Sequence, residues 1–161
     1  MIAFTYLNKK EKEKILPKLF DLLYDNMRGI APANLTYEQE KKQWLGTVSP
    51  AIDKSARQIM MCFADEELIG YIQYYINGKL LMVEELQLKQ KYHCTLTFYR
   101  FCKYFIDTLP ADIEYVEAFA DKRNINSQKL MHKLGMEFID NNSDFIHLRG
   151  NAIGIISRFT Q

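Results

Sequence analysis

A dipeptide Asn-Gly at positions 77–78 joins two runs of β-favouring residues, and it restricts the fold more than any other feature of the chain. Asn-Gly is the strongest short-range hairpin signal, because both residues tolerate the positive φ angles of a tight type I′ turn. The run before it, residues 68–76, and the run after it, residues 80–88, are therefore expected to pair antiparallel. A third run, residues 58–64, precedes them across a tight turn at 65–67, so the pattern predicts a three-stranded meander.

Helical periodicity and turn residues place further elements on both sides of this meander. The pattern predicts strands over residues 2–7, 113–120, 136–139 and 145–148, and helices from KKEKEK to Met27 with Pro17 inside, from Thr36 to about Trp44, over 96–109 and over 126–134. GTVSPAIDKSAR, residues 46–57, is expected to be a loop. The final segment, residues 152–161, either continues the sheet or trails across it. This is an α+β order with a mixed sheet, expected to form a single domain over residues 1–161.

Composition limits the function classes. A chain of 161 residues that is 48% hydrophobic is long enough for one sizeable core. A net charge of +1 provides no field that favours nucleic acid or a membrane surface as partner. Three cysteines suit reduced thiols, and neither a signal sequence nor an apolar run of membrane-spanning length is present, so we expect a cytoplasmic protein. The three histidines lack the spacing of a metal site.

The stretch NINSQKLMHKLGM, residues 124–136, contains more than an amphipathic helix with a glycine stop. Together with the element order, it resembles the motif N-x-x-[AS]-x-x-L-Y-x-K-x-G-F of the GNAT superfamily of acyl-CoA-dependent N-acetyltransferases. Five positions fall in register: Asn124, Ser127, Leu130, Lys133 and Gly135. The resemblance implies a GNAT-like fold, with Asn124 and the helix carrying Ser127 beside the pantetheine arm of acetyl-CoA.

A second stretch, EELQLKQKYHCTLTFYR at residues 84–100, is similar to the superfamily pattern E-D-L-x-V-x-P-x-Y-R-G-x-G-I-G-x-x-L. The positions in register are Glu84, Glu85, Leu86, Leu88 and Tyr92. The resemblance implies that the backbone of Leu86, Gln87 and Leu88 pairs with the pantetheine amides, as a strand added to a sheet opening would. It also implies that the following helix start binds the pyrophosphate through His93, Cys94, Thr95, Leu96 and Thr97.

Acetyl transfer to an amine needs a base that removes the ammonium proton. Glu84 or Glu85 is the best candidate, reached directly or through a water molecule. Strict strand alternation places the two side chains on opposite faces, whereas a β-bulge would reverse the parity, so either residue remains a candidate. The resemblance then implies an N-acetyltransferase that acts on a primary amine of a small molecule or peptide, and we allow for a homodimer.

Two positions depart from the superfamily pattern. None of residues 93–98 is glycine, although the superfamily's phosphate turn carries glycines that let backbone N–H groups approach the anion. Met131 stands where the superfamily has a tyrosine that protonates the CoA thiolate, and a thioether cannot donate a proton. Tyr92, Tyr99 or a water molecule are alternative proton donors. These departures favour a rival function, a catalytically silent GNAT-like domain that binds a ligand or a protein partner.

Overall fold

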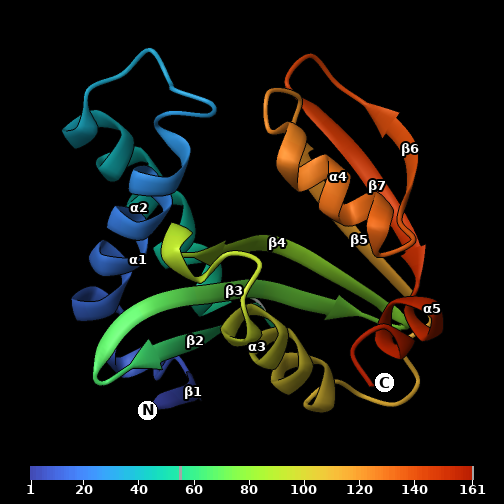
Figure 1. Cartoon of the computed structure of the whole chain (residues 1–161). Helices are drawn as coiled ribbons and strands as arrows, with labels where there is room; N and C mark the ends of the chain where they lie inside the picture. The colour runs from blue at the N-terminus through green and yellow to red at the C-terminus, as the bar shows by residue number, and fades with distance from the viewer. Residues whose placement is uncertain (55, 161) are drawn as a thin grey trace.

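A mixed seven-stranded sheet of order β1-β2-β3-β4-β5-β7-β6 forms the centre of the computed structural model, which describes residues 1–54 and 56–160 (Figure 1). Its strands are β1 (Ile2–Tyr6), β2 (Gln58–Ala64), β3 (Glu67–Asn77), β4 (Leu80–Leu88), β5 (Tyr115–Asp121), β6 (Glu137–Asn141) and β7 (Phe145–Asn151). β2, β3 and β4 pair antiparallel, which confirms the predicted meander. The predicted mixed sheet is also confirmed, because β4 and β5 pair parallel.

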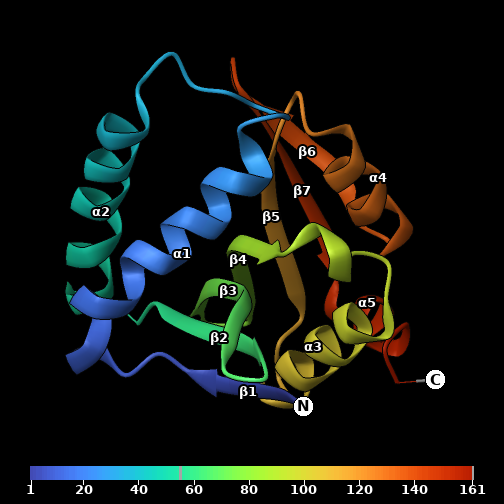
Figure 2. The same ribbon diagram turned by 60° about the vertical axis from the view of Figure 1, so that its left-hand side comes forward.

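Helices cover the two faces of the sheet unequally (Figures 1 and 2). The helices are α1 (Lys12–Met27), α2 (Tyr37–Lys54), α3 (Leu96–Asp107), α4 (Ile125–Lys133) and α5 (Ala152–Ser157), with short 3-10 turns η1 (Lys9–Glu11) and η2 (Gln90–Tyr92). On one face, α1 and α2 bury Leu19 and Ile52 against Tyr71 of β3. On the other face, Phe101 and Phe105 of α3 pack into the larger core, which extends to α5. Apolar periodicity in each helix accounts for both contacts.

The expected loop over residues 46–57 is wrong, because α2 continues through Pro50 to Lys54. Gly46 and Pro50 resemble breakers in the sequence, but Val48 and Ile52 are buried against α1. Packing of this apolar stripe outweighs the backbone hydrogen bond that the proline cannot make. Ser55 of the expected loop and Gln161 of the expected terminal segment lie outside the described residues.

Both expectations for the final segment are wrong, since residues 152–157 form the short helix α5. The side chain of Asn151 accepts hydrogen bonds from Ile153 N and Gly154 N and so caps the helix. Ala152 and Ile155 are buried in the main core. The end of α4 follows the prediction, because Gly135 adopts the left-handed backbone, φ +90°, expected of a glycine helix stop.

The sheet splays between β4 and β5. The two strands pair parallel from Leu80 opposite Tyr115 to Val83 opposite Ala118. Beyond Val83, β4 runs toward α1, while β5 continues beside β7, and Figure 1 shows the two strands diverging. The residues of β4 from Glu84 onward thus lie along the edge of the splay. Within the described part of the chain, no helix is both long and apolar enough to cross a membrane.

Candidate active site

A β-bulge in β4 decides where the two candidate carboxylates point. Gln73 of β3 lies opposite Glu85, whereas the next residue, Tyr74, lies opposite Val83, so the register skips Glu84. A bulge places two consecutive residues opposite one and breaks the strict alternation of side chains. Glu84 hydrogen-bonds Gln73, and Glu85 acts electrostatically on Tyr71, which packs beneath α1 and α2. Both carboxylates therefore lie on the face of the sheet that α1 and α2 cover.

Glu84 is held by two hydrogen-bond donors. Its Oε1 accepts from Arg57 Nε at 2.7 Å, and its Oε2 accepts from Gln73 Nε2 at 2.6 Å. The Arg57 guanidinium also lies over the ring of Tyr75, 4.7 Å from the centroid. Because a cation and an amide already bind both oxygens, Glu84 is the anionic centre of a fixed polar network.

Glu85 has a different environment. Burial raises the pKa of Glu85 to about 7, the hydrogen bond from Gln87 Nε2 at 3.2 Å opposes this rise, and the negative charge of Glu84 adds to it. A carboxyl group with a pKa near 7 is half ionised near neutral pH, which is the condition that suits a general base. Of the two glutamates, Glu85 therefore has the chemistry of a proton acceptor.

Along β4, the backbone N–H and C=O groups of successive residues point alternately toward β3 and toward the splay. Lys89 N donates to Ile69 O at 2.8 Å, so the antiparallel alternation turns the N–H and C=O groups of Leu86 and Leu88 away from β3. Leu86 is exposed, whereas the Leu88 carbonyl accepts from Asn26 Nδ2 at 2.9 Å and from His93 Nε2 at 2.6 Å. Gln87 accepts from Asn26 through its side chain. The structure thus presents Leu86 as an open backbone position and Leu88 as one that the protein's own side chains occupy.

The turn after β4 adopts a glycine-like backbone without glycine. Cys94 is exposed and has φ +56°, in the left-handed region that favours glycine. Thr95 begins α3, and its hydroxyl donates to Tyr92 O at 2.6 Å. Among the described residues, no side chain caps the N-terminus of α3. The first N–H groups of this helix, at the exposed Leu96 and the half-buried Thr97, are therefore available to an anion.

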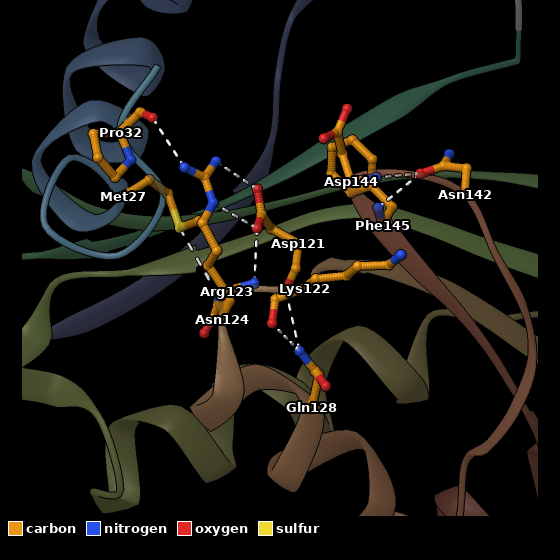
Figure 3. Close-up of polar contacts among 10 residues, drawn as sticks. All are labelled: Met27, Pro32, Asp121, Lys122, Arg123, Asn124, Gln128, Asn142, Asp144 and Phe145. Carbon is orange, nitrogen blue, oxygen red and sulfur yellow. Dashed lines mark hydrogen bonds and ion pairs between the residues drawn. The ribbon is translucent and has the colours of Figure 1, made fainter. Parts of the chain in front are cut away.

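Asn124 and Ser127 lie at the start of α4, beyond the end of β5. Asn124 Oδ1 accepts from Ser127 N at 3.1 Å and caps α4. Its Nδ2 faces Met27 Sδ at 3.9 Å (Figure 3). The neighbouring Arg123 binds both oxygens of Asp121 and donates from Nη1 to Pro32 O at 3.1 Å. The structure therefore gives Asn124 a local capping role and brings it against the end of α1.

The end of α1 and the segment after it bridge the two arms of the splay. Asn26 binds the Leu88 carbonyl at the end of β4, while Met27 and Pro32 contact Asn124 and Arg123 beyond β5 (Figure 3). We call these contacts the α1 clasp. The clasp places the end of α1 across the open end of the splay, beside the edge of β4.

The two tyrosines considered as proton donors, Tyr92 and Tyr99, pack against the main core of the sheet. Met131 packs against the same core from α4. The Tyr99 hydroxyl donates to Phe159 O at 2.6 Å. The hydroxyl of Tyr99 is therefore bound to the C-terminal segment.

Sequence reasoning missed three residues of this site: Asn26, Arg57 and Gln73. Gln73 stands out in retrospect as the one amide in the apolar run YIQYY, and a polar residue in a buried strand indicates a specific partner. Arg57 fell within the expected loop, and Asn26 near the end of a helix. Their roles depend on contacts between elements far apart in the chain.

Comparison with known proteins identifies the fold. No protein-family profile matches the sequence, and no curated protein matches it significantly. Solved structures do match: the PaiA N-acetyltransferase of Thermoplasma acidophilum in complex with coenzyme A has a TM-score of 0.71 at 16% identity, covering 94% of this chain and 99% of that chain. A GNAT-family acetyltransferase of Staphylococcus aureus has a TM-score of 0.64 at 12% identity, with 94% and 99% covered. A mutant of the SpeG spermidine N-acetyltransferase of Vibrio cholerae has a TM-score of 0.60 at 10% identity, with 98% and 97% covered. The chain therefore has the GNAT acetyltransferase fold, in a divergent sequence.

Proposed function

We propose that the protein is an N-acetyltransferase that moves the acetyl group of acetyl-CoA to a primary amine of a small molecule or peptide. The observation that carries this proposal is the pair of carboxylates at the bulge of β4, where one is fixed by Arg57 and the other, Glu85, has a raised pKa. The GNAT fold and its coenzyme A complex in a structural neighbour support the choice of cofactor.

In the proposed reaction, the amine reaches the site as an ammonium ion and Glu85 takes one proton from it. The neutral nitrogen then attacks the thioester carbonyl carbon, forming the C–N bond as the C–S bond breaks. The amine loses its second proton, and the CoA thiolate gains one, so that the products are an amide and free CoA. The ion pair between Glu84 and Arg57 holds Glu84 in place beside Glu85 on this face of the sheet.

Acetyl-CoA is proposed to lie in the splay between β4 and β5. The backbone groups of Leu86, which the alternation turns away from β3, would pair with pantetheine amides. The N-terminus of α3, with Cys94, Thr95, Leu96 and Thr97 around it, would bind the pyrophosphate. His93 occupies the Leu88 carbonyl in this structure and would move if the cofactor paired with that group as well.

Thermal unfolding with and without the cofactor tests the proposal most directly. A ligand that binds only the folded state, at a hundredfold over its Kd, adds ~2.7 kcal/mol of stability. We expect acetyl-CoA to raise the Tm and to support acetylation of at least one member of an amine panel. An unchanged Tm at millimolar acetyl-CoA would rule out the proposed acetyltransferase function.

A catalytically silent domain is the second candidate. The absence of glycine from residues 93–98, the Met131 thioether and the occupied Leu88 carbonyl favour it. Under this alternative, tight cofactor binding has been lost, so we expect coenzyme A to leave the Tm unchanged and no amine to be acetylated. The two functions are separated by measuring the free CoA thiol released from acetyl-CoA in the presence of amines, with coenzyme A binding measured in parallel.

A further inference from the structure

Two buried polar atoms beside Glu85 lack hydrogen-bond partners among the described residues: Tyr71 Oη and Gln73 Oε1. The side chains are 0% and 5% exposed. Unpaired buried groups are uncommon in folded proteins, because each loses its hydrogen bonds to water without replacement. A third such atom, His147 Nε2, lies 3.4 Å from Glu117 Oε2 and so has a charged neighbour.

Tyr71 and Gln73 lie on one face of β3 and flank Glu85. They are two positions apart and so point to the same side of the sheet. Gln73 is directly opposite Glu85, and Tyr71 is opposite Gln87, diagonal to Glu85. Cross-strand neighbours at both positions are within reach of long and aromatic side chains.

The two atoms have complementary hydrogen-bonding capacity. The Gln73 amide donates through Nε2 to Glu84, so its Oε1 is left as a pure acceptor. The Tyr71 hydroxyl can donate, because burial, with a smaller effect from the nearby charge of Glu85, raises its pKa and keeps it protonated. A protonated carboxyl group needs an acceptor, whereas an ionised carboxylate needs a donor. A titrating carboxyl group that reached both side chains would satisfy each in turn.

We propose that Gln73 and Tyr71 are positioning residues for Glu85, Gln73 Oε1 accepting a hydrogen bond from the protonated carboxyl and Tyr71 Oη donating to the ionised carboxylate. The pair holds the Glu85 carboxyl in place before and after it takes a proton. The link to catalysis rests on the proposed function, in which that proton comes from the substrate ammonium. The hydrogen-bond exchange itself does not depend on any substrate.

The other groups around Glu85 are already engaged. On β4, Glu84 is bound by Arg57 and Gln73, and Gln87 donates to Glu85. From α1, the neutral amide of Asn26 reaches Gln87 rather than Glu85. Among the described residues, the charge of Glu84 acts on the pKa of Glu85, and the charge of Glu85 acts on Tyr71. We therefore expect the removal of Tyr71 Oη or Gln73 Oε1 to move the pKa of Glu85 in a defined direction.

The test is a carboxyl titration by NMR of protein labelled with 13C at glutamate side chains, in which the Glu85 signal is assigned by its loss in Glu85→Gln. Tyr71→Phe removes the donor to the ionised form, so we expect the pKa of Glu85 to rise by ~0.5 to 1. Gln73→Met removes the acceptor of the protonated form, so we expect a fall of similar size. Tyr74→Phe, a buried tyrosine on the same strand whose hydroxyl faces Tyr6 and Gln58, is the matched control.

Opposite shifts with an unchanged control support the proposal. Shifts in the same direction, or no shift in either variant, overturn it, because loss of packing alone has no reason to move the pKa in opposite senses. The readout needs no turnover. If the opposite shifts occur in a protein that acetylates no amine, the proposed function fails while the positioning pair stands. If turnover is present, the acid limb of the kcat/KM pH profile moves with the titration.

Discussion

The Nε atom of Arg57 lies 2.7 Å from Glu84 Oε1, while the adjacent Glu85 receives its hydrogen bond from the neutral amide of Gln87. Two consecutive glutamates on one face of the sheet therefore differ in charge environment, because a bulge turns both the same way while the guanidinium binds one of them. This difference gives the two residues separable roles.

Glu85→Gln is expected to lower kcat/KM for the amine by ~10²-fold or more, since a positioned general base contributes ~10² to 10⁴-fold. The amide keeps the size of the side chain and cannot accept the proton. Affinity for coenzyme A, measured by calorimetry, stays the same. Glu84→Gln is the matched control and retains more activity than Glu85→Gln; equal losses in the two variants would contradict the assignment of the base.

The free energy of unfolding is expected to fall as the pH rises through a window set by the pKa of Glu85. The pKa of Glu85 is about 7 in the folded protein, above its ordinary value of 4.5, so between these values the folded state holds a proton that the unfolded chain has released. Stability from this group is therefore lost as pH rises through the window, by up to ~3 kcal/mol. Urea unfolding should be measured at about pH 5 and about pH 8. The stability of Glu85→Gln relative to that of the natural protein should be higher at the higher pH. A constant difference between the two proteins would contradict the raised pKa.

Cys94→Gly is expected to stabilise the fold and to strengthen coenzyme A binding. A side chain at φ +56° is strained by ~1 kcal/mol relative to glycine, and its Cβ atom narrows the approach to the N-terminus of α3. Calorimetry gives the Kd and thermal unfolding the Tm. Cys94→Ala removes the thiol but keeps the Cβ atom, so it separates backbone strain from thiol chemistry and should show neither gain.

Arg123→Met is expected to loosen the segment after α1. The Arg123 guanidinium joins Asp121 to the Pro32 carbonyl, so its loss frees one end of the α1 clasp. Hydrogen exchange followed by mass spectrometry should show faster exchange over residues 28–36, with the central strands unchanged. The control is Lys122→Met, because Figure 3 shows the Lys122 side chain extending away from Pro32. Equal exchange in both variants would mean that Arg123 does not hold the segment.

The strands and most helices were predictable because their signals are local. Alternation, the Asn-Gly turn and Gly135 each specify a conformation within a few residues. The length of α2 was not predictable, because the burial of Val48 and Ile52 against α1 outweighs the helix-breaking tendency of Gly46 and Pro50. Secondary structure fails where contacts between distant segments outweigh local preference.

The candidate site was predictable only in part. Sequence placed Glu84 and Glu85 in the right strand but left their direction open, because a bulge depends on pairing with β3 rather than on β4 alone. The contacts of Arg57, Asn26 and Gln73 join elements that are distant in the chain, so no spacing rule finds them. The left-handed backbone at Cys94 carries no sequence signal, because the expected glycine is absent.

The extra residue in β4 also makes strand length a functional property. Deleting Glu84 would leave Gln73 opposite Glu85 and Tyr74 opposite Val83 in one continuous ladder, so the sheet would still close around its core. The shortened strand would lose the bend that accompanies a bulge. The number of residues between the hairpin turn and the end of this strand therefore decides which way Glu84 and Glu85 point, independently of the identity of either side chain.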